Sequence, residues 1–401
     1  MQTVVLAAGR GTRMGPLTDE RPKPMLPVAD RPLLAHVLDA AAAAGASRFV
    51  VVDGPGATGV EPYVGETYAG APVTYVTQRE RRGTADAVER AADALDDAPF
   101  VVLNGDVLYD PEGLARLYRE CPAVGATRVA EPSEYGVLQP ANPSAPHADR
   151  LVRGVVEKPA DPPSNLVNAG AYAFPSAARE WLDVPVSDRG ERELTDVLDR
   201  TCEAFDVRAV PFEEWLDVGR PWELLAANER ALADLSRDLA GEVSPDAHLS
   251  GAVVVEEGAT VERGVTIEGP ALVRSGATVG PNAYVRGRTL LGEDVSVGHA
   301  VEIKNSVLMA GTNVNHLSYV GDSVLGRSVN LGAGTVVANL RHDGEPVGLT
   351  VKGRRRSTGR RKFGVVLGDE VATGVDTSLN AGVTLGTGVT TDPGETVRRD
   401  R

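Results

Sequence analysis

The sequence predicts an α/β domain with a doubly wound, parallel or mixed sheet, followed by a β-helix of hexapeptide repeats. Two periodicities support this prediction. Short apolar runs alternate with helical patterns over roughly the first 230 residues, which is typical of strands and helices that cover both faces of one sheet. From Val243 onward, aliphatic residues recur at every sixth position. A helix repeats about every 3.6 residues and a strand about every 2, whereas a coil of short strands and turns explains a longer period.

The first domain opens with a buried strand and continues with alternating elements. A helix is expected over 33–44, because Pro32 precedes its apolar run and Gly45 follows it. A second helix is expected over 222–240, where leucines keep to one face and Gly241 ends the pattern. We interpret this second helix as the connector between the domains. The expected strands are 3–8, 49–53, 73–77 and 100–104.

The six-residue repeats of the second domain run without a gap over many turns. The register shifts by one residue at Leu308 and again at Leu325, and a polar segment at about 340–364 interrupts it. We therefore expect one β-helix with a projecting loop. The repeating residues are Val243, Leu249, Val255, Val261, Ile267, Val273, Val279, Val285, Leu291, Val297 and Ile303. The expected domains are 1–221 and 242–401, joined by a helical linker at 222–241.

Composition limits the class of protein. The chain has 401 residues, 42% hydrophobic residues and a formal net charge of −15, which indicates a globular protein and argues against nucleic-acid or membrane binding by the chain as a whole. It contains 5 Lys and 36 Arg, a bias that fits either salt adaptation or a GC-rich genome. Two cysteines and the lack of an apolar run of ~18 residues fit a cytoplasmic protein without a disulfide framework or membrane span.

A glycine-containing segment, LAAGRGTRM, directly follows the first expected strand at 6–14. Its glycines allow backbone N–H groups to approach phosphates and a nucleobase closely. Met14 excludes the dinucleotide fingerprint, and there is no Lys-Ser/Thr pair of a P-loop. Arg13 and Lys23 add two cations near the same strand end. An ordinary turn beside surface charges is the alternative, which the RPKPMLP segment ten residues further on disfavours.

This combination of LAAGRGTRM and RPKPMLPV resembles the sugar nucleotidylyltransferase family, which has a Rossmann-like nucleotide-diphospho-sugar transferase fold. Further motifs follow in the family's order: QRERRGTADAV, LNGDVLYD, EYGVL, VVEKP, VNAG and WLDVGRPW. The resemblance implies catalytic roles for Arg13, which holds the triphosphate, and Lys23, which binds the phosphate under attack. It implies nucleotide binding by Leu6, Ala7, Ala8, Gly9, Gln78, Gly83, Thr84, Asn104 and Gly105. It implies sugar-phosphate binding by Gly136, Glu157, Lys158 and Asn168, and metal binding by Asp106 and Asp217.

The chemistry supports these roles. Two carboxylates at strand ends are suited to hold Mg²⁺ against a triphosphate. Phosphoryl-type transfer requires mainly positioning and neutralisation of charge. A general base is not needed, because the attacking sugar phosphate is already an anion. Gln78 would suit either uracil or thymine, so UTP and dTTP both remain open.

A polar cluster interrupts the hexapeptide pattern where its register shifts. It contains Glu302, Lys304, Asn315, His316, Tyr319, Asn330 and Asn339, and His316 is its only histidine. A histidine here is either a solvated turn residue or part of a site. The string NHLSYVGDSVLGRSVNLGAGT resembles the acetyltransferase half of the bifunctional enzymes that make UDP-N-acetylglucosamine, and the DG loop with KGRRRSTGRRKFG resembles their archaeal branch.

This second resemblance implies a left-handed β-helix, a homotrimer and an acetyl transfer from acetyl-CoA to glucosamine-1-phosphate or galactosamine-1-phosphate. It implies that His316 is the general base. The implied amino-sugar-phosphate residues are Arg286, Lys304, Tyr319 and Asn330, and the implied acetyl-CoA residues are Ala333 and Asn339. The chain departs from the family at Glu345, where a Lys is expected, and at Val375, where a Ser is expected.

Two other interpretations remain open. The chain is alternatively a glucose-1-phosphate uridylyl- or thymidylyltransferase whose β-helix only regulates or oligomerises it, or a non-catalytic assembly subunit. Intact Lys23, Asp106 and Asp217 argue against a silent subunit, and His316 argues against a purely regulatory β-helix. The segment 352–362 carries seven Arg or Lys residues. It is either a solvated, salt-bridging loop or a contact for substrate phosphates, and it lacks the aromatic residues of a nucleic-acid site.

Overall fold

The structure is a computed structural model of the chain, and it describes residues 1–56, 58–142 and 151–401. Its contacts divide the chain into two compact units. The first unit comprises Met1–Arg10, Pro22–Met25 and Leu33–Asp217. The second comprises Gly11–Arg21, Leu26–Pro32 and Val218–Arg401. Each unit is described by itself.

The first unit is built on a mixed sheet, which has ten strands within the described residues. Its parallel centre has the order β7-β1-β4-β6, so the predicted strands are confirmed. Antiparallel pairings of β12 with β7 and β9 make the remainder mixed. The strands are β1 Gln2–Leu6, β4 Arg48–Asp53, β5 Thr67–Tyr68, β6 Ala71–Thr77, β7 Phe100–Asn104, β9 Ala123–Arg128, β10 Gly136–Pro140, β11 Leu151–Glu157, β12 Leu166–Phe174 and β13 Val207–Pro211. A separate pair consists of β8 Val107–Leu108 and β14 Leu216–Asp217.

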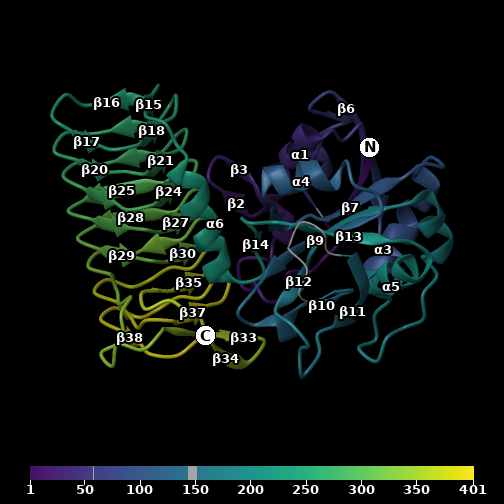
Figure 1. The fold of residues 1–401 in the computed structure, drawn as a ribbon. Coiled ribbons are helices and arrows are strands. Elements are labelled where there is room, and N and C mark those ends of the chain that lie inside the picture. Colours follow the sequence, from purple (N-terminus) through teal and green to yellow (C-terminus); the bar gives the residue numbers. More distant parts are fainter. Residues whose placement is uncertain (57, 143–150) are drawn as a thin grey trace. The chain divides into compact units, whose positions relative to one another are not determined.

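Helices cover both faces of this sheet (Figure 1), as the alternating pattern predicts. On one face, α1 Leu33–Ala44, α2 Val60–Val64 and α4 Pro111–Leu117 contribute to one apolar core. On the other, α3 Thr84–Ala91 and α5 Leu194–Ala204 contribute to a second core. Short 3-10 helices are η1 Lys23–Met25, η2 Ala92–Ala94, η3 Pro132–Glu134 and η5 Ser176–Trp181. The first unit therefore has the Rossmann-like layering that the sequence predicts.

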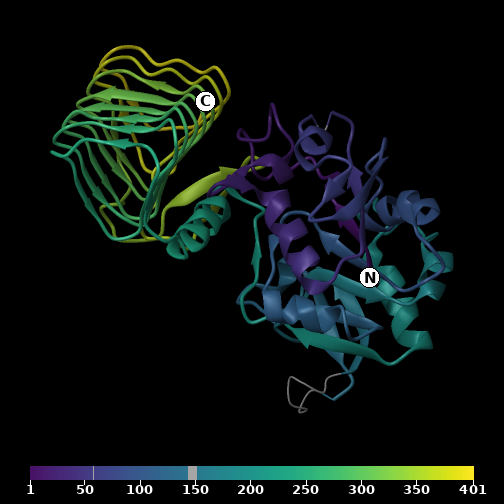
Figure 2. The ribbon, with the colours of Figure 1, turned by 90° about the horizontal axis from the view of Figure 1, so that it is seen from above.

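The second unit contains a coil of three parallel sheets, which is consistent with a β-helix and has a roughly triangular outline when seen from above (Figure 2). Successive strands go to different sheets. The first sheet comprises β15 Asp238–Leu239, β18 Val253–Val255, β21 Ala271–Val273, β24 Thr289–Leu291, β27 Val307–Leu308, β30 Val324–Leu325, β35 Val366–Leu367 and β37 Thr384–Leu385. The second comprises β16 Glu242–Val243, β19 Thr260–Val261, β22 Thr278–Val279, β25 Ser296–His299, β28 Asn313–His316 and β31 Asn330–Leu331. The third comprises β17 His248–Ser250, β20 Thr266–Glu268, β23 Tyr284–Arg286, β26 Glu302–Lys304, β29 Tyr319–Gly321, β32 Val336–Val337, β36 Ser378–Leu379 and β38 Thr396–Val397.

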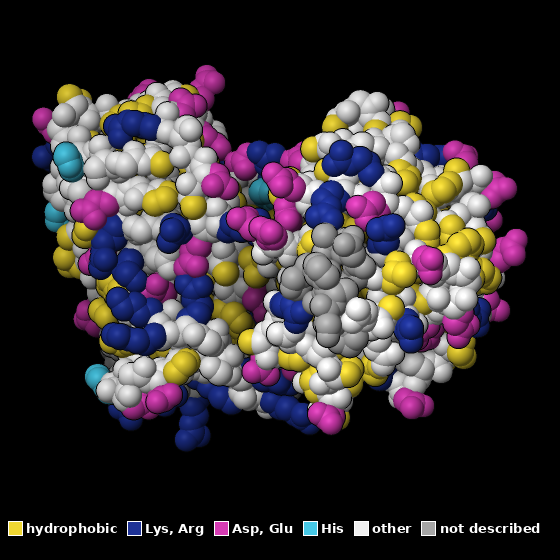
Figure 3. All heavy atoms as spheres, viewed as in Figure 1, with side chains coloured by type: hydrophobic (Ala, Val, Ile, Leu, Met, Phe, Trp, Pro, Cys, Tyr) yellow, Lys and Arg dark blue, Asp and Glu magenta, His cyan; other side chains and the backbone are white. Residues whose placement is uncertain are grey.

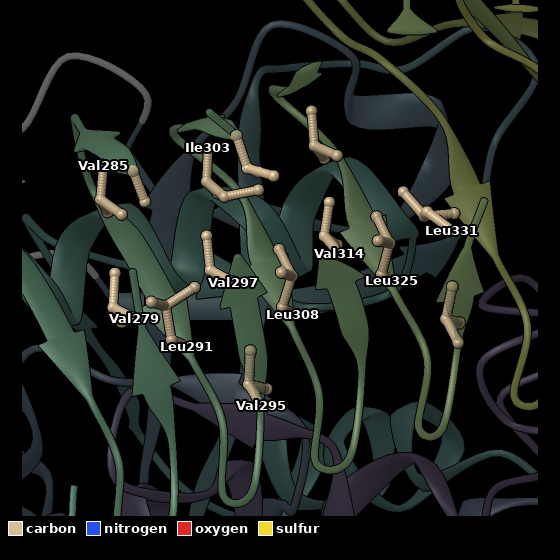
Figure 4. Close-up of a cluster of buried hydrophobic side chains, with 14 of the residues drawn as sticks. Val279, Val285, Leu291, Val295, Val297, Ile303, Leu308, Val314, Leu325 and Leu331 are labelled. Carbon is tan, nitrogen blue, oxygen red and sulfur yellow. The ribbon is translucent and has the colours of Figure 1, made fainter. Parts of the chain in front are cut away.

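The six-residue repeat places aliphatic side chains of successive strands inside the coil (Figure 4). Val255 and Val273 pair in register, 18 positions apart in sequence. Leu291, Leu308 and Leu325 also pair in register, although each step here is only 17 positions. The predicted shifts of register are therefore turns that are one residue shorter, and they keep the apolar stack continuous. The handedness of the coil stays a prediction.

The helix expected over 222–240 is shorter than predicted. The observed α6 spans Pro221–Ala233, and Asp238–Leu239 instead forms β15, which pairs with β18. Leucine spacing extended the prediction too far, because parallel pairing on the coil satisfies the backbone of 238–239 as well as a helix does. The buried Asn228 side chain of α6 accepts a hydrogen bond from Ala29 N at 2.8 Å and donates to Pro27 O at 3.0 Å. These bonds hold the hairpin of β2 Pro27–Val28 and β3 Arg31–Pro32.

The interruption predicted at about 340–364 is confirmed as a projecting segment. It contains an antiparallel hairpin of β33 Gly348–Val351 and β34 Arg354–Ser357, and the coil resumes at β35. Within the described residues, no helix is long and apolar enough to cross a membrane.

Candidate active sites

Several predicted nucleotide-binding residues lie together at the carboxyl ends of adjacent parallel strands. Leu6 pairs in register with both Val52 and Asn104. The carbonyl of Leu6 accepts a hydrogen bond from Gly105 N at 2.9 Å. A Cβ atom at Gly105 would lie 2.7 Å from that same carbonyl oxygen. Glycine is therefore required for this close approach of the two strand ends.

Gln78 lies one strand further along the same edge, and its side chain is oriented by two hydrogen bonds. Its backbone N–H donates to Asp53 O at 2.8 Å. Its amide Nε2 donates to Gly83 O at 2.9 Å and to Asp86 Oδ2 at 2.7 Å. A backbone carbonyl oxygen only accepts hydrogen bonds, so the contact with Gly83 fixes which side of the amide carries nitrogen. Among the described residues, nothing donates to the Oε1 of Gln78, which leaves an acceptor for a ligand.

The structure adds residues that the motifs did not single out. Asp86 is fully buried on α3, and a lone acid on the apolar face of a helix is the signal that would have found it. Arg81 Nε donates to Ala8 O at 2.6 Å. Burial, and then the nearby Arg10, lower the pKa of Arg81. Arg81 therefore joins the QRERRG segment to the first glycine segment, and Thr84 Oγ1 joins it to α5 by accepting from Leu194 N at 2.9 Å.

The two predicted metal carboxylates lie on neighbouring strands. Asp217 on β14 pairs in register with Val107 on β8, so it is one register position from Asp106. Lys23, whose exposed fraction is only 5%, makes an ion pair through Nζ with Asp106. Within the described residues no group of three or more His, Cys, Asp or Glu is arranged for a metal. Two carboxylates fit Mg²⁺, which takes most of its remaining ligands from phosphates and water.

Arg13 is assigned to a different unit from these residues. It belongs to the second unit, where a Cβ atom at Gly219 would lie 3.1 Å from its guanidinium nitrogen. Leu6 to Gly9 and Lys23 belong to the first unit. The predicted phosphate-binding cations are thus divided between the units.

Asn104 and Asn168 are linked through a buried tyrosine. Tyr109 accepts a hydrogen bond from Asn104 N at 2.9 Å and donates to Gly170 O at 2.7 Å. Burial raises the pKa of Tyr109 well above its ordinary value, so the phenol keeps its proton as a donor. Asn168 Oδ1 accepts from Gly170 N at 2.9 Å. A Cβ atom at Gly170 would lie 2.3 Å from Asn104 Nδ2.

The other predicted sugar-phosphate residues also lie together. Gly136 and Glu157 pair in register on β10 and β11. Glu157 Oε1 lies 3.3 Å from Lys158 Nζ and 3.2 Å from Arg189. A Cβ atom at Gly136 would lie 2.9 Å from the other carboxylate oxygen of Glu157. The Glu157 carboxylate is therefore held by two cations and lies close to the backbone at Gly136, which has no side chain. Arg189 was missed by motif reasoning, because it lies in a loop far from these strands in sequence.

The coil carries a second polar cluster on its third sheet. Arg286 donates to Glu302 Oε1 at 2.8 Å. The buried Asp322 accepts hydrogen bonds from Asn305 at 3.0 Å and Asn339 at 2.6 Å, and it makes an ion pair with Lys304. Asn339 also donates to the Tyr319 hydroxyl at 3.1 Å. The structure thus brings together Arg286, Lys304, Tyr319 and Asn339, and it identifies Asp322 as the shared acceptor that sequence reasoning missed.

His316 ends β28 and is exposed, just before the corner that leads to Tyr319 on β29. It pairs in register with His299 on the adjacent turn of the coil. The prediction that His316 is the only histidine at this cluster is therefore wrong, because register brings together residues 17 positions apart. The Nδ1 of His299 lies 3.4 Å from Asn282 Nδ2.

The remaining predicted acetyl-site residues lie on the next turn of the coil. Asn330 begins β31 and is exposed, and Asn313 is its register partner. The Ala333 carbonyl accepts from Asp376 N at 2.7 Å. Asn330 and Ala333 follow His316 along the second sheet and its corner. Within the described residues, no hydrogen bond joins these two residues to the cluster around Asp322.

The basic segment 352–362 is partly paired. Arg355 donates to Gly382 O at 3.0 Å, and Arg360 makes an ion pair with Glu229 of α6. Its other basic residues are exposed, with Arg356 also engaged in a contact. In Figure 3, Lys and Arg side chains gather over the lower turns of the coil. The projecting segment is therefore held at its base while its charged surface faces solvent.

These features define a nucleotidyltransferase domain joined to a coil of hexapeptide repeats. Residues 2–234 match the family model described as nucleotidyl transferase, and residues 267–387 match the one described as GMPPB C-terminal domain.

The relatives narrow this class further. The chain is 36% identical to the Bifunctional protein GlmU of Methanocaldococcus jannaschii over 96% of this chain and 92% of the relative. It is 36% identical to the Bifunctional sugar-1-phosphate nucleotidylyltransferase/acetyltransferase of Sulfurisphaera tokodaii over 100% and 98%. The chain belongs to this family of bifunctional sugar-1-phosphate nucleotidylyltransferases and acetyltransferases. A solved UDP-glucose pyrophosphorylase in complex with UDP-glucose is similar with a TM-score of 0.53 and 26% identity, covering 58% of this chain and 98% of that chain.

Replacing Gly170 by Ala tests the packing behind Asn104. Gly170 has a φ of +72° and Gly190 has a φ of +79°, but nothing lies within 4 Å of a Cβ atom at Gly190. Both substitutions carry the backbone cost of about 1–2 kcal/mol for a left-handed residue. Only Gly170→Ala also displaces Asn104. We expect a larger loss of unfolding free energy and of nucleotidyl transfer for Gly170→Ala, and equal losses in the two variants would contradict this account.

Proposed function

We propose that the chain transfers a uridylyl or thymidylyl group from the triphosphate to a sugar-1-phosphate, and an acetyl group from acetyl-CoA to an amino-sugar phosphate. The order we favour is acetylation of glucosamine-1-phosphate or galactosamine-1-phosphate, followed by nucleotidyl transfer and release of pyrophosphate. One observation supports the nucleotidyl-transfer part of this proposal. Lys23 makes an ion pair with Asp106, and Asp217 lies one register position from Asp106. All three residues belong to the same unit as Gln78.

The base site favours a pyrimidine. Uracil and thymine both present an N3–H donor, and the Oε1 of Gln78 is an acceptor held in place through Asp86. This contact serves both bases equally, because the thymine methyl group is remote from N3. The backbone of Leu6 to Gly9 would lie along the nucleoside.

The phosphates require cations and a metal. Asp106 and Asp217 would hold Mg²⁺, which neutralises charge on the triphosphate when it is bound. Lys23 is buried and already positioned by Asp106, so it presents a fixed ammonium group to the phosphate under attack. Arg13 would bind the triphosphate. The sugar phosphate attacks as an anion, so no residue has to accept a proton in this step.

The sugar would occupy the region of Asn168, Gly136 and Glu157. A carboxylate accepts hydrogen bonds from sugar hydroxyl groups. Glu157 is suited to this role, because ion pairs with Lys158 and Arg189 hold its carboxylate in place. Lys158 would add positive charge for the sugar phosphate.

Replacement of the metal carboxylates tests the first reaction. Asp106→Asn and Asp217→Asn should each lower Mg²⁺-dependent release of pyrophosphate by at least about 10²-fold, since charge neutralisation is lost. EDTA should abolish the reaction of the unaltered protein, and acetyl transfer should persist in both variants. Asp97→Asn, an exposed surface change, is the control. Pyrophosphate release that survives in both variants contradicts the metal assignment.

The second reaction requires a base, because an amine is protonated at neutral pH and must lose a proton before it attacks a thioester. His316 would accept that proton. The amine nitrogen then forms a bond to the acetyl carbonyl carbon as the carbon–sulfur bond breaks. The nitrogen loses a second proton to become the amide, which balances the proton that the CoA thiolate takes up as it leaves as the thiol. Arg286, Lys304, Tyr319 and Asn330 would hold the amino-sugar phosphate, while Ala333 and Asn339 would contact acetyl-CoA. The clustering of Lys304, Tyr319 and Asn339 around Asp322 supports this assignment.

Two histidine variants test the base. His316→Ala should lower thiol release from acetyl-CoA with glucosamine-1-phosphate or galactosamine-1-phosphate by ~10²–10⁴-fold, because a positioned base is lost. Pyrophosphate release should be unchanged. His299→Ala, which removes the imidazole on the adjacent turn of the coil, is the matched control and should keep most thiol release. The reverse result would move the base to His299.

A second candidate function has specific support. Glu345 and Val375 replace the expected Lys and Ser, and the coil matches a model described as GMPPB C-terminal domain. A glucose-1-phosphate uridylyl- or thymidylyltransferase with a regulatory or oligomerising coil would have these features. Lack of thiol release by the unaltered protein with either amino-sugar phosphate would favour it.

We further propose the domains 1–221 and 242–401, a left-handed coil and a homotrimer. Flat sheet faces with apolar residues favour closed cyclic symmetry, and Leu317 and Val336 are 65% and 47% exposed on the coil. We expect light scattering to give a molar mass about three times that of the 42.1 kDa chain. A mass of one chain at working salt would contradict the trimer.

A further inference from the structure

The segment between the two N-terminal motifs, Gly11–Arg21, is bound to the coil. We call it the signature loop. It belongs to the second unit together with the coil, although Leu6 to Gly9 and Lys23 on either side of it belong to the first. Its last residue, Arg21, directly precedes Pro22 and Lys23. The placement of this loop therefore depends on contacts that the nucleotidyl motifs do not reveal.

Arg21 provides the main polar contact. Its side chain is only 10% exposed, and one guanidinium nitrogen lies 2.5 Å from Asp369 Oδ2. The other terminal nitrogen lies 3.1 Å from the sulfur of the buried Met309. Among the described residues the Nε of Arg21 has no hydrogen-bond partner. Asp369 is therefore the one carboxylate that compensates this buried charge within the described residues, and removal of one partner of such a pair is costly.

Asp369 is itself held rigidly on the coil, two residues after β35. Its side chain is 8% exposed. Its Oδ1 accepts a hydrogen bond from the backbone N–H of Arg327 at 2.8 Å, and its Oδ2 accepts one from Arg327 Nε at 3.2 Å. The carboxylate thus faces two arginines, one from the signature loop and one from the coil. The side chain of Arg327 is 48% exposed, so this second arginine remains solvated without Asp369.

The signature loop has internal structure that transmits this contact to Arg13. Met14 N donates to Gly11 O at 2.7 Å, and Thr18 Oγ1 donates to the same carbonyl at 3.0 Å. The side chains of Met14 and Leu17 are fully buried. Near the end of the loop, Thr387 Oγ1 of the coil donates to Asp19 Oδ2 at 3.4 Å. Because the signature loop is packed and fixed at Arg21, the backbone position of Arg13 is restricted.

We propose that Asp369, a residue of the acetyltransferase coil, is a positioning residue for nucleotidyl transfer. It acts through Arg21, holds the signature loop and thereby orients Arg13 and the backbone that precedes Lys23. It touches no substrate. This inference rests on the nucleotidyl-transfer part of the proposed function and is independent of the acetyl-transfer part. It means that the coil of this chain participates in the reaction of the other domain.

The test is a double-mutant cycle in the full-length protein with Asp369→Asn, Arg21→Gln and the combined variant. Misplacement of a positioning group by about 1 Å costs up to ~10²-fold in rate. We expect each single variant to lower kcat/KM for pyrophosphate release by about 10–10²-fold, with a raised KM for the nucleoside triphosphate. The combined variant should be no worse than the poorer single variant, because both remove the same contact. Arg327→Gln, which removes the other partner of Asp369, should leave nucleotidyl transfer unchanged.

Amide hydrogen exchange gives a readout that does not depend on catalysis. Residues 11–21 should exchange faster in Asp369→Asn and in Arg21→Gln, but not in Arg327→Gln. If Asp369→Asn does not fold, Arg21→Gln carries the test, since Arg327 still compensates Asp369 there. Unchanged KM and kcat in Arg21→Gln, or strictly additive losses in the cycle, would overturn the proposal. An unaltered protein that transfers no nucleotidyl group would contradict the proposed function itself, and the inference with it.

Discussion

In-register pairing of parallel strands is the constraint on which both units depend. In the first unit it aligns the carboxyl ends of four neighbouring strands, so that Leu6, Gln78 and Asn104 share one edge. In the coil it stacks residues that are 17 or 18 positions apart, so that aliphatic side chains of successive strands fill the interior. The same register places His299 beside His316 and Arg286 beside Lys304. Backbone hydrogen bonding between strands thus fixes which site residues lie side by side.

Two of the three predicted phosphate-binding lysines have largely buried side chains, and each is held by a carboxylate. Lys23 pairs with Asp106, and Lys304 pairs with Asp322. Burial of a lone charge is strongly unfavourable, so each lysine requires a partner in the folded protein. The carboxylate also keeps the long lysine side chain in one conformation. Less side-chain conformational entropy is therefore lost when a phosphate binds to the lysine. Asp322 extends this role, because Asn305 and Asn339 donate to it as well.

Short motifs and apolar runs predict contiguous groups of residues, but they do not show which residues from other elements contact them. The strands and α1 were predicted close to their observed bounds, because their apolar runs are long and bounded by Pro or Gly. The helix at 222–240 was overextended, since leucine spacing does not show where pairing with the coil replaces the helix. Asp86, Arg189 and Asp322 were missed because each contacts a residue from another element. Asp86 and Asp322 lie inside the quoted motifs, but a motif string does not show which residue a carboxylate meets.

The sequence by itself determined the two architectures, the order of the motifs and the family. These properties depend on local periodicity and on short strings of residues, which a chain carries before it folds. The tertiary structure decided that the signature loop belongs to the coil unit, that His316 has a histidine neighbour, and which carboxylate each buried cation meets. Such facts depend on contacts between residues that are separated in sequence, by 17 positions for His299 and His316 and by 348 for Arg21 and Asp369. Packing and the need to compensate buried charge select those contacts, and neither leaves a local signature in the sequence.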